Sequence, residues 1–268
     1  MMISLTMALA LAAEQNSKQP DINSLLSGTF SNEEQVYFEK DAGRESPPWI
    51  SLKIAKSDDG WQLQEVDAHS QHLGEVQSVS LVKGNMRDTI TVGNCSRFFD
   101  RAETDWKYSS IQNRKACRQK FQITEISAEG LKLRLSDGTE TLLKRGRDVE
   151  CWAAIPKTIK KEDGSTDWLF KRNLNLHDQG GRATIGGGDS GAEEVTLRMR
   201  AVHWPPPSTN RPSMVLYIHK DDPNSAASYS WADIDASRVG INLRWMQASC
   251  TIKGAERPSE VTNTNFRG

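Results

Sequence analysis

The sequence predicts a mostly β fold, built as an antiparallel barrel or sandwich. Apolar and polar residues alternate in short segments from residue 49 onward, and this period of two is typical of strands with one buried face. Asp-Gly, Lys-Gly and Glu-Gly pairs separate these segments and favour tight turns between antiparallel strands. The sequence carries no long window of helical periodicity, which disfavours a doubly wound α/β fold.

Residues 131–135 give the clearest strand signal. They read Leu-Lys-Leu-Arg-Leu, and the turn residues Ser-Asp-Gly-Thr at 136–139 lead into a second strand at 141–143, which together predict a hairpin. A short helix is expected at residues 21–27, with Asp21 or Asn23 as its N-cap. Further strands are expected at residues 49–54, 61–66, 76–82, 89–92, 121–126, 149–155, 168–176, 195–203, 214–219 and 239–246.

The chain divides into four stretches. Residues 1–13 are expected to be a signal peptide, residues 21–156 a barrel region, residues 165–253 a β-rich C-terminal region and residues 254–268 a loose polar tail. The polar residues between the second and third stretches mark a boundary or a long hairpin loop. The C-terminal region completes the same barrel or forms a second small domain, and the sequence leaves both alternatives open.

The N-terminus favours export. Residues 1–13 read MMISLTMALALAA, a run too short for a bilayer span of about 20 residues and typical of the apolar part of a secretory signal. No Lys or Arg precedes the run, so a buried strand or short helix of the mature fold remains the alternative. Export predicts a periplasmic or secreted protein with no integral membrane segment in the mature chain.

The cysteine count agrees with export. The four cysteines, an even number, favour two disulfide bridges in an oxidising compartment. Of the three possible pairings we expect Cys95–Cys117, which would close a polar, insertion-like stretch, and Cys151–Cys250, which would tie the C-terminal strand to the middle of the chain. A zinc site is the weaker alternative, because no two cysteines have Cys-x-x-Cys spacing.

Overall charge excludes some partners. The formal net charge is −1 with 34 basic and 35 acidic residues, so the chain lacks the global field that attracts nucleic acid or anionic lipid. We therefore expect no nucleic-acid partner.

The glycine-rich segment Gly186–Gly191 matches two functional patterns. It fits G-x-G-x-x-G, but strand-like residues follow it, whereas a dinucleotide site needs a helix there. It also contains the Gly-Asp-Ser-Gly of trypsin-like proteases, with His69 as the nearest candidate base for Ser190. The Gly-Pro that follows that motif in those proteases is absent here. A turn between strands is the favoured interpretation.

Histidines and tryptophans complete the candidates. His69 and His72 have H-x-x-H spacing, but in an extended segment they point to opposite sides, so no metal site is assigned. The eight tryptophans line a ligand cavity or belong to the core, and both interpretations stay open.

The first half of the chain resembles the CpcT/CpeT chromophore lyase family. Residues 28–35, Gly-Thr-Phe-Ser-Asn-Glu-Glu-Gln, are similar to the family's opening G-x-F-S-N-x-x-Q. Asp-Gly-Trp at 59–61 followed by Glu65, Arg-Gln-Lys at 118–120, Asp-Gly-Thr at 137–139, Gly-Arg-Asp-Val at 146–149 and Gly-Ala at 191–192 follow in the family's order.

The resemblance implies a calycin-like antiparallel barrel, and the chain extends beyond the family's usual end, with additional C-terminal strands. The ligand site expected in such a barrel includes Trp49, Trp61, Glu65 and Arg118. The expected ligand is a small apolar or tetrapyrrole-like molecule. The best-known members attach a tetrapyrrole to phycobiliproteins. Export argues against that role for this chain, because phycobiliproteins are not periplasmic. Three functions remain open: a ligand-binding barrel, a bilin lyase, and a non-enzymatic envelope protein. The sequence assigns no reaction, catalytic residue or cofactor.

Overall fold

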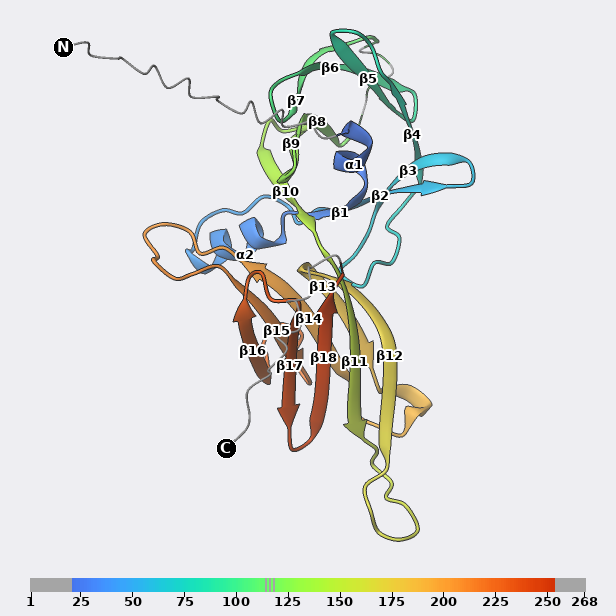
Figure 1. Ribbon diagram of the computed structural model, residues 1–268, viewed down its shortest axis with the longest axis vertical. Coiled ribbons are helices and arrows are strands. Elements are labelled where there is room, and N and C mark those ends of the chain that lie inside the picture. The colour runs from blue at the N-terminus through green and yellow to red at the C-terminus, as the bar shows by residue number, and fades with distance from the viewer. Residues whose placement is uncertain (1–20, 114, 116, 118, 254–268) are drawn as a thin grey trace, which may run out of the picture.

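The structure is a computed structural model that describes residues 21–253 except 114, 116 and 118. The expected leader and polar tail lie outside the described residues. Ten antiparallel strands form a closed barrel in the order β1-β10-β9-β8-β7-β6-β5-β4-β3-β2 (Figure 1). They are β1 (Gly28–Ser31), β2 (Ser51–Ser57), β3 (Gly60–Glu65), β4 (Gln77–Val82), β5 (Arg87–Val92), β6 (Cys95–Arg101), β7 (Trp106–Ile111), β8 (Phe121–Ile126), β9 (Gly130–Leu135) and β10 (Glu140–Gly146).

Apolar side chains fill the barrel. The alternation expected for β9 places Leu131 and Leu133 inside, where they are fully buried. The predicted helix is α1 (Ile22–Leu26), capped by the side chain of Asp21, and it covers one end of the barrel with its own apolar residues (Figure 1). The other buried members are Phe30, Ile50, Leu52, Ile54, Leu63, Val79, Ile90, Val92, Phe99, Trp106, Ile123, Ile126 and Leu143.

Strands β6 and β7 correct the expectation of a polar insertion between Cys95 and Cys117. Both belong to the barrel, and Phe99 and Trp106 face its core. Charged residues near these strands make the segment look polar, although some of them are buried. Asp88 of β5 is buried and accepts hydrogen bonds from Trp106 Nε1 at 2.8 Å and from Arg101.

The C-terminal strands form two further sheets, so they do not complete the barrel. Their orders are β12-β11-β18-β17 and β13-β14-β15-β16, and both sheets contribute to one apolar core, as in a sandwich. The first sheet contains β11 (Asp148–Pro156), β12 (Trp168–His177), β17 (Arg238–Leu243) and β18 (Met246–Ile252), and the second contains β13 (Gln179–Ile185), β14 (Val195–Val202), β15 (Ser213–His219) and β16 (Ser228–Asp233).

Two boundaries differ from the expected ones. The barrel ends at Gly146, and β11 pairs with β12 and β18 in the sandwich. The strand expected at 239–246 is divided by a turn, because Leu243 and Met246 face each other across a hairpin. The period of two continues through both points, so the sequence pattern does not reveal them.

Both expected disulfides are confirmed. Cys95 bonds to Cys117, and Cys151 bonds to Cys250 across the paired strands β11 and β18. Within the described part of the chain, no helix has the length and apolar composition needed to cross a membrane.

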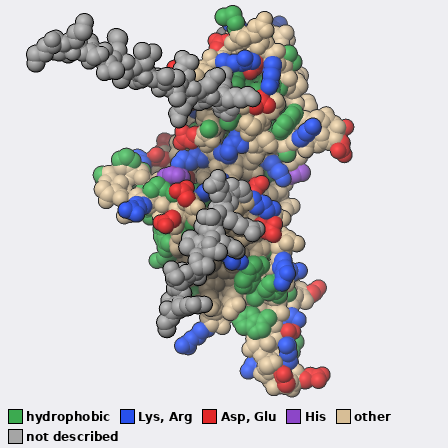
Figure 2. All heavy atoms as spheres, in the orientation of Figure 1, with side chains coloured by type: hydrophobic (Ala, Val, Ile, Leu, Met, Phe, Trp, Pro, Cys, Tyr) green, Lys and Arg blue, Asp and Glu red, His purple; other side chains and the backbone are tan. Residues whose placement is uncertain are grey.

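The outer face of the first sheet carries an exposed aromatic group over β11 and β12, in which Trp152 stacks on Phe170 at 5.5 Å beside Trp168 (Figure 2).

Candidate anion-binding site

Helix α2 (Glu33–Asp41) lies between the barrel and the sandwich (Figure 1). This helix was not predicted, because its residues are mostly polar on every side. Asn32 holds its start: the side chain accepts from Ile50 N at 2.8 Å and donates to Pro48 O and Thr141 Oγ1. Thr141 also donates to Gln35. The Asn and Gln of the opening motif therefore fasten α2 to the barrel.

The next residue, Glu33, joins α2 to the sandwich. Its carboxylate forms an ion pair with Arg198 and accepts from Arg200 Nε at 3.0 Å. Gly180, at φ +84°, permits this approach, because a Cβ there would lie 2.7 Å from Glu33 Cγ. A β-bulge between Gln179 and Arg182 places the glycine opposite the helix.

The arginines lie on the outer face of the second sheet. Arg182 of β13 pairs with Arg198 of β14, and Arg198 pairs with Tyr217 of β15, so these side chains share one face. With α2 they form a cavity of about 430 Å³, which we call the arginine cleft. It is lined by Glu33, Val36, Tyr37, Lys40, Trp49, Ala68, Gly180, Arg182, Arg198 and Asn224.

Positive charge exceeds negative charge in the arginine cleft. Arg198 and the buried Arg200 share one carboxylate, that of Glu33, and Arg182 lies beside Arg198 on the neighbouring strand. The guanidinium of Arg182 forms no ion pair or hydrogen bond with a described residue, and each of the three arginines has a buried N–H without a partner among those residues. Lys40 adds a further positive charge at the rim. Buried charges are normally paired, so this surplus of positive charge needs an explanation.

Burial, and to a lesser extent the neighbouring positive charges, lowers the pKa values of groups in and beside the cleft. Burial, with a smaller contribution from Arg200, lowers the pKa of Arg198 to about 10, and burial also lowers the pKa of Arg182. The pKa of His219 is lowered by burial and then by Arg182 and Arg198. The ring of Tyr37 lies 4.0 Å from the Arg200 guanidinium. This cation–π contact offsets part of the cost of burying the charge of Arg200.

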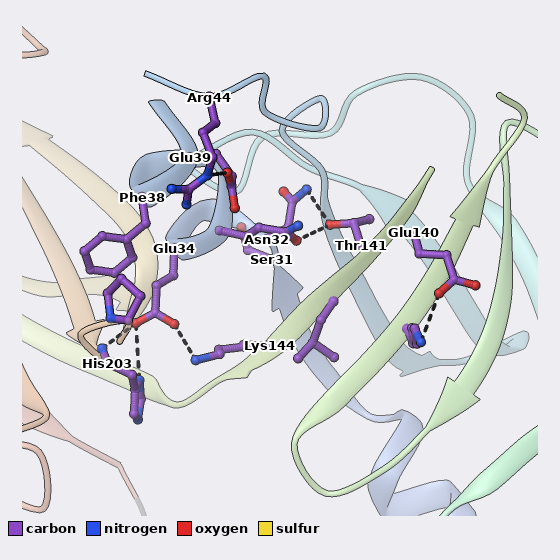
Figure 3. A pocket seen from close by; sticks show the side chains of 14 residues that line it. Ser31, Asn32, Glu34, Phe38, Glu39, Arg44, Glu140, Thr141, Lys144 and His203 are labelled. Atoms are coloured by element: carbon purple, nitrogen blue, oxygen red, sulfur yellow. Dashed lines mark hydrogen bonds and ion pairs between the residues drawn. The ribbon is translucent and has the colours of Figure 1, made fainter. Parts of the chain in front are cut away.

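Glu34 points into a second cleft, on the other side of α2 (Figure 3). Its buried carboxylate pairs with Lys144 and accepts from His203 N at 2.5 Å. The other acids lining this cleft are also paired, Glu39 with Arg44 and Glu140 with Lys132. Each carboxylate there has a cationic partner, so this cleft has no comparable excess of positive charge.

The expected site residues are not brought together. Trp49 lines the arginine cleft, whereas Trp61 packs against the barrel core. Glu65 lines a separate cavity at an end of the barrel with Leu63, Gln77 and Phe121. Arg118 lies outside the described residues.

The glycine-rich segment is a turn. Ser190 Oγ is hydrogen-bonded to the backbone of Ala192, while His69 Nε2 lies 3.1 Å from Thr184 Oγ1. Each side chain therefore has a partner other than the one that a serine protease requires.

Sequence reasoning missed the arginine cleft. The strand predicted at residues 195–203 is confirmed as β14, and a period of two places Arg198 and Arg200 on one face. Two arginines at i and i+2, on the face opposite Leu197 and Met199, are the signal that could have indicated a basic surface. Glu33 lies 167 positions from Arg200, so no local pattern connects them.

A scan of protein-family models finds no match to this chain, and neither a curated protein nor a solved structure matches it significantly.

We predict that Glu33→Gln strongly destabilises the fold. It leaves the buried arginines without their carboxylate, a loss that costs roughly 3–5 kcal/mol. Denaturant unfolding measures the change in free energy. Glu39→Gln is the control, since Glu39 belongs to a surface ion pair with Arg44 and its loss should leave stability near the original value. Equal stability of the two variants would refute the central role of Glu33.

We also predict that stability falls in mild acid because of His177. Burial lowers the pKa of this residue to about 4, although the Asp178 carboxylate opposes the shift. The unfolded chain, with a histidine pKa of about 6.5, binds the proton first, so stability is lost as pH falls from about 6.5 to about 4. At pH 5 the loss is about 2 kcal/mol. Unfolding at pH 7 and pH 5 should show this loss in the natural chain and a smaller one in His177→Gln; the same loss in both would contradict it.

Proposed function

We propose that this protein is an exported binding protein that holds a small anion in the arginine cleft. The observation that carries the proposal is the shared carboxylate: three guanidinium groups, two of them lining an open cavity, have only Glu33 as counter-charge among the described residues. An anion there would pair with Arg182 and relieve the repulsion between Arg198 and Arg200.

The size and lining of the cleft are consistent with a small organic ligand. A cavity of about 430 Å³ falls in the usual range for small-molecule sites. Tyr37 and Trp49 supply aromatic surface, and Asn224 supplies an amide. Carboxylate, sulfate and phosphate groups all match the guanidinium fork, so these three chemistries are the candidates for the charged group.

The ligand-binding barrel and the bilin lyase have less support. Their ligand requires space along the barrel axis, where the apolar side chains of the barrel core lie. Among the residues expected to bind it, Trp61 contributes to that packing and Glu65 faces a cavity at the barrel end. Export remains part of the proposal because both disulfides suit an oxidising compartment.

Titration with sodium sulfate, sodium phosphate and sodium acetate, at ionic strength matched with sodium chloride, tests the proposal. We expect sulfate, with or without the other two anions, to bind and to stabilise the fold, by about 2.7 kcal/mol at 100 times its Kd. Arg182→Gln should weaken that binding about 10- to 100-fold, because a charge-assisted hydrogen bond is lost. Arg182 has no ion pair to lose, so the variant should fold.

Arg172→Gln is the matched control. Arg172 is exposed on the first sheet, where it contacts the ring of Phe170, and its replacement makes the same change in net charge. The proposal is refuted if sulfate does not bind, or if the two variants weaken binding equally.

A further inference from the structure

An aromatic row continues from the arginine cleft across the same sheet face. Tyr217 lies beside the guanidinium groups of both Arg198 and Arg200, at 5.9 and 6.0 Å. It contacts Tyr229, and Tyr229 contacts Trp231, with ring centroids 6.2 and 5.9 Å apart. Register explains the alignment, because Arg198, Tyr217 and Tyr229 are consecutive partners on β14, β15 and β16.

The outer part of the row is exposed and held in place. Tyr229 is 57% exposed and Trp231 is 44% exposed. Trp204 stacks on Trp231 at 5.9 Å and also contacts Phe38 of α2, so the indole orientation is set by its neighbours. Large exposed rings on a rigid sheet give contact area at a low entropic cost and are typical of binding surfaces.

Charge along the row distinguishes the possible partners. The partners of Arg200 on the next strands are Val215 and Trp231, and Asp233 follows two residues after Trp231. A nucleic acid carries a phosphate on every unit and needs basic groups along its path. The row instead begins at a concentrated positive site and continues through rings towards an acidic residue.

We infer that the occupant is an acidic oligosaccharide, with one acidic sugar in the arginine cleft and neutral sugars on Tyr229 and Trp231. This inference rests on the proposed anion site and names its ligand class. The apolar C–H faces of sugar rings pack on aromatic rings, while a carboxylate or sulfate on the first sugar pairs with Arg182 and Arg198. The side-chain amide of Asn224, which also lines the cleft, can hydrogen-bond to sugar hydroxyls.

Calorimetry with two matched probe sets tests the inference. The first set is 3′-sialyllactose, N-acetylneuraminate and lactose; the second is an aldotetraouronic acid, glucuronate and xylotriose. We expect at least one acidic oligosaccharide to bind at least tenfold more tightly than its free acidic sugar, and its neutral counterpart to bind weakest. Trp231→Ala should weaken oligosaccharide binding about tenfold and leave sulfate binding unchanged.

Trp168→Ala is the control for loss of an exposed ring. Trp168 is 40% exposed on the other sheet, so its removal should change neither affinity. If sulfate still binds in an Arg182-dependent manner but neither oligosaccharide exceeds its free acidic sugar, or Trp231→Ala has no effect on them, the inference fails and the anion site stands. If sulfate, phosphate and acetate do not depend on Arg182, the anion site itself fails.

Discussion

The carboxylate of Glu33 is the contact on which the arrangement of this protein depends. It lies at the start of α2, one residue after the asparagine that ties the helix to the barrel, and it reaches two arginines of β14 in the sandwich. Because Gly180 leaves space for it, the helix can approach the sheet closely. The arginine cleft therefore exists only when barrel, helix and sandwich are all folded.

Adjacent residues of α2 differ in charge balance, and this difference is the basis of the proposed anion site. Glu34 is matched by Lys144 and by a backbone N–H of His203, and the acids around it have partners of their own. Glu33 is shared between Arg198 and Arg200, and Arg182 beside them has no described counter-charge. A fold selected for stability alone gains nothing from such a surplus, whereas an anion-binding site requires it.

The sequence allowed the class of fold to be predicted but not its division. Alternation identified most strands, and the cysteine pairing was correct, because both depend on local pattern and on simple counting. Strands β6 and β7 were among the strands missed, and the buried Arg97 interrupts the apolar alternation of β6. Helix α2 was missed because it has no apolar stripe and is stabilised by its contacts with the barrel and the sandwich. The cleft could not be predicted from a local pattern, because Glu33 and Arg200 are 167 positions apart in the sequence.

The claim that the arginine cleft is an anion site is tested most directly by a crystal structure of the full protein grown in sodium selenate, a sulfate analogue whose selenium gives an anomalous signal. We predict an anomalous peak within hydrogen-bonding distance of both Arg182 and Arg198. Selenate bound elsewhere on the surface, with no peak in the cleft, would contradict it.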